Sequence, residues 1–145
     1  MDGKCFLGTA RFLQSRGTDE AAYRSAVSRA YYACFLETRR VAFANCPQEA
    51  RRKAGIKSAR KILHESLQRY LKNGATEAVR QLGEDLAGLC GKRGDADYNM
   101  DAVLSAADAK DAVEEAQAFL NEFSRTDPVA VGEAMEAYID ATYRG

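Results

Sequence analysis

The sequence has little of the material that interrupts helices or builds β-sheets. Only two of its 145 residues are proline, Pro47 and Pro128, and valine and isoleucine together number 10. Proline breaks the interior of a helix, and β-branched residues are the usual components of strands. Alanine, the best helix former, occurs 26 times. The composition therefore predicts an all-α protein with long helices.

A long apolar run is also missing. No stretch approaches the roughly 18 residues that a membrane span requires, and no apolar signal-peptide core follows the first residues. The four cysteines, Cys5, Cys34, Cys46 and Cys90, form no CxxC pair, and His64 is the only histidine. A zinc site would need scattered ligands to converge. We therefore expect a cytoplasmic protein with reduced thiols, no metal and no other cofactor.

The chain has no net charge, because 21 Lys/Arg balance 21 Asp/Glu. The two halves differ, however: residues 1–75 carry 15 basic and 6 acidic side chains, and residues 76–145 carry 6 and 15. Either the halves pack together and partly neutralise each other, or a basic face is available to an anion such as RNA or a nucleotide. Six basic residues between positions 51 and 61 allow two similar interpretations, a grip on phosphate or a solvated loop and helix start.

Apolar residues recur at three- and four-residue spacing along most of the chain, which indicates amphipathic helices. We expect helices over about 4–14, 19–45, from 56 or 58 to 71, 77–89, 104–123 and from 129 to 138 or a little beyond, with a loop over 47–57 and a glycine-containing junction over 91–102. Short connections favour antiparallel neighbours. Residues 1–145 are therefore predicted to form one domain, an up-and-down bundle of four to five core helices plus a short C-terminal helix.

Capping residues mark several of the expected helix ends. Gly17 suits the C-terminal cap of the first helix. The expected N-terminal caps are Thr18 or Asp19, Thr76, Ser105 paired with Asp108, and Asp127 followed by Pro128.

The second helix has two faces of buried character. Opposite its main apolar stripe lie Ser25, Arg29, Tyr32 and Leu36 at helical spacing. A helix in a monomeric bundle normally has a polar outer face, so this face is covered either by another helix of the chain or by a second copy. Arg29 and Tyr32 could form an anion pocket, or the arginine stem could pack on the tyrosine ring.

Arg93 and His64 are the side chains of greatest chemical interest. Arg93 extends an apolar stripe, which directs its guanidinium to a place where an unpaired charge costs several kcal/mol. Asp95 or Asp97 could pair with it in a structural role, or Arg93 could serve a binding site. His64 lies beside an apolar stripe and is either a packed or capping residue or a group for proton transfer.

Two stretches in combination resemble the signatures of a known family. Residues 28–35, SRAYYACF, resemble the SRxYYAxF signature of HEPN domains, and residues 93–98, RGDADY, resemble the RxxADY signature of an uncharacterised prokaryotic branch of that family. His64 resembles the third-helix histidine of that branch, and residues 108–123 are similar to its following helix. The likeness covers about residues 4–125 and leaves the last 18 or so unmatched.

The resemblance implies a bundle of four to five helices, often a homodimer, encoded beside a minimal nucleotidyltransferase. Many HEPN domains are toxins that cut RNA with an arginine, which holds the scissile phosphate, and a histidine that follows after four to six intervening residues and transfers protons. Arg93 matches this arginine, but Tyr98, Asn99 and Met100 occupy the positions of the histidine. A phenol has an ordinary pKa near 10 and is a poor general base at pH 7.

Three functions follow as expectations. The first is a HEPN-like binding or regulatory module, the partner of a minimal nucleotidyltransferase, which interacts with nucleotide or RNA and is not an enzyme. The second is a metal-independent endoribonuclease toxin of a toxin–antitoxin pair, with Arg93, Tyr98 and His64 as candidate catalytic residues. The third is a dimeric helical scaffold without a ligand. The candidate binding residues are Arg93, Asp97, Tyr98, Arg29 and Tyr32.

Overall fold

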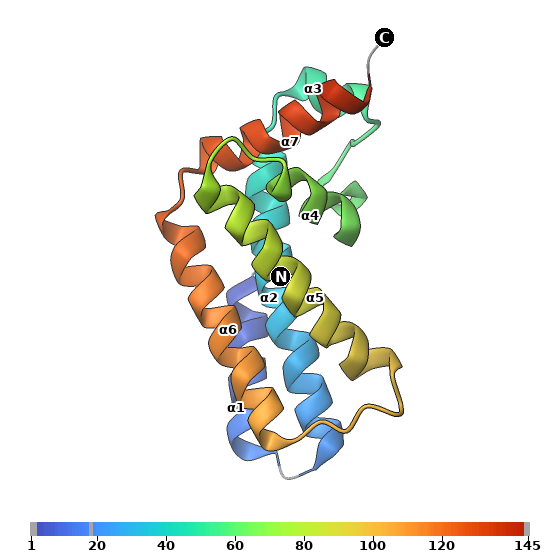
Figure 1. Ribbon diagram of the computed structural model, residues 1–145, viewed down its shortest axis with the longest axis vertical. Helices are drawn as coiled ribbons and strands as arrows, with labels where there is room; N and C mark the ends of the chain where they lie inside the picture. Colours follow the sequence, from blue (N-terminus) through green and yellow to red (C-terminus); the bar gives the residue numbers. More distant parts are fainter. Residues whose placement is uncertain (1–2, 18, 144–145) are drawn as a thin grey trace. The chain divides into compact units, whose positions relative to one another are not determined.

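A computed structural model describes residues 3–17 and 19–143, and these residues are helical with short connections (Figure 1). No strand occurs among them, so the prediction of an all-α fold is confirmed. Within this part of the chain, no helix is both long enough and apolar enough to cross a membrane. The elements in chain order are α1 (Gly3–Arg16), α2 (Glu20–Asn45), α3 (Gln48–Lys53), the 3₁₀ turn η1 (Ala59–Lys61), α4 (His64–Lys72), α5 (Glu77–Tyr98), α6 (Ala106–Arg125) and α7 (Pro128–Thr142).

The chain divides into two compact units, each built from two separate segments. The first unit comprises Met1–Glu37 and Leu86–Asn121, and the second comprises Thr38–Asp85 and Glu122–Gly145. Helices α2 and α5 each pass from one unit to the other part-way along their length, and α6 does so near its end.

The core of the first unit is rich in alanine. Ala30 and Ala33 of α2 and Ala109, Ala112 and Ala116 of α6 are all completely buried. Small side chains allow helix backbones to approach closely, while alanine itself favours the helical conformation. The frequent alanines that predicted helices from the sequence therefore also decide how tightly this unit packs.

Aromatic rings and one close backbone approach complete the first unit. Tyr31 and Phe35 stack with their ring centroids 5.8 Å apart, and both rings are buried. A Cβ on Gly3 would lie 2.5 Å from the carbonyl oxygen of Ala33, so a larger residue at the start of α1 would push α1 away from α2. This contact holds α1 against the helix that carries Tyr31 and Tyr32.

The second unit forms where α7 packs against α3 and α4. Tyr70 of α4 and Tyr138 of α7 meet edge to face, with ring centroids 5.4 Å apart. Gly132 of α7 lies directly against the backbone of Asn45 at the end of α2, where a Cβ would collide with the carbonyl group. The final helix, whose role the sequence could not indicate, is thus part of a core.

Three predicted boundaries were wrong. Residues 48–53, expected in a loop, form α3, which buries only Ala50 and is too short to show an apolar period. Helix α4 begins at His64 rather than at 56 or 58, and α5 continues through Gly91 and Gly94 to Tyr98 instead of ending before a junction. The last helix ends at Thr142, a little beyond Tyr138 as expected.

The capping predictions are confirmed wherever the structure describes the residues. Asp19 accepts a hydrogen bond from the Ala22 N–H, and Thr76 accepts one from the Val79 N–H. The remaining predicted caps also form: Gly17 N–H to Leu13 O, Ser105 with Asp108 in both directions, and Asp127 with the Val129 N–H. Thr18, the alternative cap of α2, lies outside the described residues.

Candidate functional site

Arg93 lies at the centre of a polar and aromatic cluster in the first unit. Its side chain is only 14% exposed, and Nη2 donates a hydrogen bond of 2.6 Å to the hydroxyl of Tyr32. Nε lies 3.2 Å from Oδ2 of Asp97, one helical turn further along α5. That contact is an ion pair without hydrogen-bond alignment, because the buried Nε has no hydrogen-bond partner. The guanidinium is thus neutralised by a neighbour on its own helix.

Three tyrosine rings surround the same guanidinium. Its central carbon lies 5.7 Å from the ring centroid of Tyr31, 5.2 Å from that of Tyr32 and 5.4 Å from that of Tyr98. A cation within about 6 Å of an aromatic centroid is attracted to the ring. The SRxYYAxF-like segment of α2 and the RxxADY-like segment of α5 therefore meet at Arg93.

The charge of Arg93 is maintained despite burial. Desolvation disfavours the guanidinium, but the Tyr32 hydroxyl, followed by the charges of Tyr32, Tyr98 and Asp97, outweighs that effect and raises the pKa of Arg93 above its ordinary value. Burial, together with the neighbouring Cys90 thiol, raises the pKa of Tyr31 far above its ordinary value. Arg93 is therefore a permanent cation and Tyr31 a neutral phenol, so neither of these groups can exchange protons at neutral pH.

Arg24 holds the C-terminal end of α5 in place. Its Nη1 donates hydrogen bonds of 2.9–3.1 Å to the carbonyl oxygens of Asp95, Ala96 and Asn99, and Nη2 donates to that of Ala102. The last carbonyl groups of a helix have no partners within the helix, so a cation there supplies both hydrogen bonds and a favourable charge. This clamp explains how α5 persists through two glycines as far as Tyr98.

Glu20 completes the clamp. Its carboxylate pairs with Arg24 at 2.9 Å and accepts a hydrogen bond of 3.2 Å from the Leu104 N–H. These partners, with the Leu104 N–H the largest influence, lower the pKa of Glu20 below its usual range. One ion pair at the start of α2 thus fixes both ends of the connection between α5 and α6.

The segment after Arg93 presents apolar side chains to solvent. Tyr98 is 72% exposed, and Met100 and Val103 are more than four-fifths exposed. Large apolar residues that are solvent-accessible on an ordered connection are typical of contact surfaces. Tyr98 therefore has one face on a buried cation and the other available to a ligand or partner.

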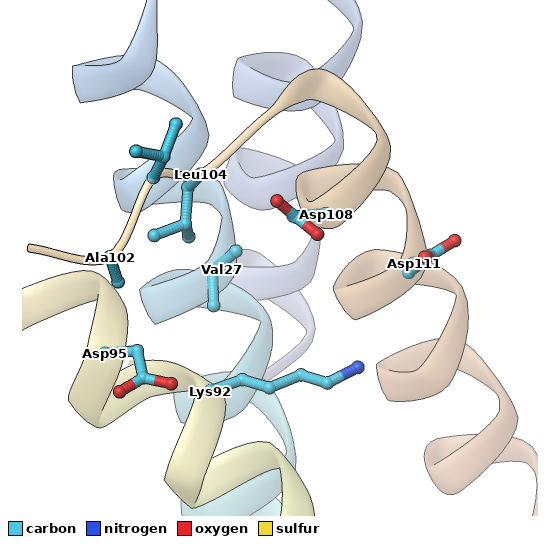
Figure 2. Close-up of a pocket in the computed structure, with 8 residues that line it drawn as sticks. Val27, Lys92, Asp95, Ala102, Leu104, Asp108 and Asp111 are labelled. Carbon is cyan, nitrogen blue, oxygen red and sulfur yellow. The ribbon is translucent and has the colours of Figure 1, made fainter.

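A hollow of about 200 Å³ lies beside this connection, still within the first unit. Figure 2 shows Val27 and Leu104 next to one another at the hollow, with Asp108 and Asp111 on α6 and Lys92 extending from α5 towards α6. With Asp95 also in the lining, three carboxylates face one lysine. The lysine amine already pairs with Glu115. The hollow is therefore net acidic and unsuited to a phosphate.

Four of the five predicted binding residues form one connected group. Arg93, Asp97, Tyr98 and Tyr32 are in direct contact, as described above. Arg29 does not reach them: its guanidinium lies 5.5 Å from the ring centroid of Phe6 in α1, and that ring is 6.1 Å from the ring of Tyr32. At this point α1 lies against the second face of α2, whereas Ser25 and Arg29 on the same face are exposed, so a dimer contact there stays a prediction.

One predicted site residue, the histidine at position 64, remains to be placed. His64 is the first residue of α4 and belongs to the second unit, whereas the residues described around Arg93 belong to the first. Among the described residues, no three His, Cys, Asp or Glu side chains are arranged to hold a metal ion. Asp97 also accepts a hydrogen bond of 3.2 Å from Ser28, the first residue of the SRxYYAxF-like segment.

Arg24 is the structurally important residue that sequence reasoning missed. The available signal was its position four residues after Glu20 on one helix face, a spacing typical of ion pairs. That signal does not reveal the four carbonyl groups on a distant segment.

Comparisons of the chain with family models, with curated proteins and with solved structures found no match.

Proposed function

We propose that this chain is a HEPN-like binding or regulatory module of the cytoplasm and not a ribonuclease. The observation that carries the proposal is the state of Arg93, which is largely buried, paired with Asp97 and enclosed by tyrosine rings. An arginine that grips a scissile phosphate must present its N–H groups to the substrate. Here one N–H group is committed to Tyr32 and the charge is already balanced.

The composition of the first unit supports the same proposal, because none of its residues is a histidine. The only histidine of the sequence is His64, which belongs to the other unit. Proton transfer at neutral pH requires a group whose pKa lies near the working pH. With tyrosines around it, Arg93 is better suited to a structural role at this surface than to proton transfer.

The proposed contact surface is the exposed face of Tyr98. We propose nucleotide or RNA as its ligand, because a base can stack on an exposed aromatic ring. The proposed protein partners are a minimal nucleotidyltransferase and a second copy of the chain. Stacking of one base on an aromatic side chain contributes about 1–3 kcal/mol. Tyr98→Ala should therefore weaken binding of a labelled single-stranded RNA by about tenfold, measured by fluorescence anisotropy.

Phe12→Ala is the matched control. Phe12 is an aromatic residue of the same unit, and 64% of its surface is exposed. Its removal should leave RNA affinity unchanged. Equal binding by wild type and both variants would contradict the proposed contact surface.

One observation favours the alternative, a metal-independent ribonuclease toxin. The exposed Tyr98 ring lies 5.4 Å from the central carbon of Arg93, so a reacting phosphate at the surface would have a phenol close to a cation. Incubation with single-stranded RNA and a metal chelator separates the two functions. We expect no cleavage. Robust cleavage by wild type that disappears in Tyr98→Phe would replace the binding module with the toxin.

A further inference from the structure

The second unit contains a basic hollow that the site around Arg93 does not involve. It has a volume of about 280 Å³, near the lower end of the range for small-molecule pockets. It lies around α3 and the turn that follows it. The lining residues are Gln48, Arg51, Arg52, Gly55, Ile56 and Lys57. Three of the six are cations and none is acidic.

Arg51 is held rigidly in this hollow. Its Nε donates a hydrogen bond of 3.1 Å to the carbonyl oxygen of Cys46, and its guanidinium lies 4.2 Å from the ring centroid of Phe43. Nη1 and Nη2 form no hydrogen bond or ion pair in the described part of the chain. A guanidinium fixed through Nε and its flat face keeps its outer N–H groups available at little further entropic cost.

The other two cations are not neutralised either. Within the described residues, Arg52 and Lys57 form no ion pair, whereas Lys53, which does not line the hollow, pairs with Asp140 at 3.2 Å. Like charges that converge without a counter-ion are unfavourable, and an anion in the hollow would relieve that repulsion. Asp140 therefore pairs with Lys53, which does not line the hollow, and does not neutralise Arg52 or Lys57.

The backbone of the turn makes this convergence possible. Gly55 has a φ of 71°, in the left-handed region that favours glycine, and reverses the chain after α3. The N–H groups of Gly55 and Ile56 satisfy the carbonyl oxygens of Arg52 and Arg51, and the side chain of Ile56 is buried. The turn is thus fixed at both ends, and the carbonyl oxygens of Arg51 and Arg52 are paired within it.

We propose that this hollow binds a phosphate group, as part of a nucleotide or of an RNA backbone. Phosphate carries more charge than a carboxylate and accepts hydrogen bonds from several directions, which matches three cations around one hollow. A carboxylate would neutralise only one of them. The proposal does not depend on the function assigned to the Tyr98 surface, because every residue in it belongs to the second unit.

The test is the double variant Arg52→Gln with Lys57→Gln, since both side chains are exposed and their removal leaves the packing of Arg51 intact. Calorimetric titration with inorganic pyrophosphate and adenosine 5′-monophosphate, and anisotropy with a short single-stranded RNA, compare it with wild type. We expect wild type to bind phosphate probes but not adenosine. The double variant should bind them about tenfold more weakly or worse. Binding of the small probes identifies a nucleotide ligand, and binding of RNA alone identifies the phosphate backbone.

Arg60→Gln with Lys61→Gln is the matched control. It removes the same charge from the same basic stretch, and neither residue lines the hollow. Its affinity should stay within about twofold of wild type, apart from the general salt effect on RNA. Equal weakening by the two double variants, absence of binding to any phosphate probe, or tighter binding of an acidic peptide would each overturn the proposal. Tyr98→Ala should not alter pyrophosphate binding.

Discussion

At the scale of single residues, Arg93 shows how a helical protein accommodates a charge on the apolar side of a helix. Asp97 supplies the counter-charge, Tyr32 supplies a hydrogen-bond acceptor, and three rings cover the faces of the guanidinium. Each of these partners compensates part of the loss of hydration. The cluster therefore contributes to stability only while it is complete.

Truncation of Arg93 should destabilise the protein without unfolding it. Arg93→Ala removes the partner of Asp97 and the donor to Tyr32, and we expect a loss of about 2–3 kcal/mol in the free energy of unfolding. Urea denaturation followed by circular dichroism measures this loss. Lys92→Ala removes the neighbouring, more exposed cation and should cost less than about 1 kcal/mol. Equal losses for the two variants would mean that the Arg93 cluster is not structural.

Thiol reactivity should separate the cysteines by their surroundings. Burial, followed by the negative charges of Glu136 and Asp140, raises the pKa of Cys46 to about 11, and burial raises that of Cys34 further. Only the thiolate is nucleophilic, so Cys46 should react slowly at pH 8 and faster as the pH approaches 11. Alkylation followed by mass spectrometry should label the exposed Cys5 first. Early labelling of Cys46 would contradict this environment.

At the scale of elements, the clamp of Arg24 on α5 is the feature that sequence patterns could not reveal. The periodicity and caps were sufficient to place α2, α6 and the start of α5, because these signals are local. The continuation of α5 through Gly91 and Gly94 depends on hydrogen bonds from a residue about seventy positions earlier, and α3 is too short for any apolar period. The sequence offered Asp97 as a partner of Arg93, but the contact of Arg93 with Tyr32 joins segments about sixty positions apart and, like the clamp, has no local signal.

Loss of this clamp should release the end of α5. Arg24→Ala leaves four carbonyl oxygens without the guanidinium, and we expect a destabilisation of about 1–3 kcal/mol together with faster amide hydrogen exchange over residues 95–104. Hydrogen exchange with mass spectrometry resolves that segment. Arg69→Ala, which removes only an exposed pair with Glu65, should change stability by less than about 0.5 kcal/mol. Unchanged exchange over 95–104 in Arg24→Ala would show that the clamp is dispensable.

At the scale of the whole molecule, folding redistributes the charge asymmetry of the sequence. Residues 1–75 have a net charge of +9 and residues 76–145 a net charge of −9, but each unit contains segments from both halves. The first unit contains 8 Lys/Arg and 11 Asp/Glu, and the second contains 13 and 10. The net charge is therefore −3 for the first unit and +3 for the second. Because these net charges are small, an anion would be attracted by a local group of cations more than by the field of an entire unit.

Self-association is the prediction that belongs to this scale. The first unit exposes Phe12, Tyr98, Met100 and Val103, and the resemblance to HEPN domains implies a homodimer. Helix α1 contacts the second face of α2 near Tyr32, but Ser25 and Arg29 on that face are exposed, so this face stays a candidate dimer surface. Multi-angle light scattering at high micromolar concentration should give twice the mass of one chain. A monomer under these conditions would remove the homodimer from the proposed partners.

The division of each unit into two separate segments has a consequence for synthesis on the ribosome. The first 37 residues complete their unit only when Leu86–Asn121 has emerged, so they must wait while Thr38–Asp85 is translated. Synthesis of residues 38–121 at typical elongation rates of about 5–20 residues per second takes about 4–17 s, which is the delay before the unit is complete. During that time the faces of α1 and α2 that contact α5 and α6 in the folded unit have no native cover, which makes this interval the point at which a chaperone would be needed.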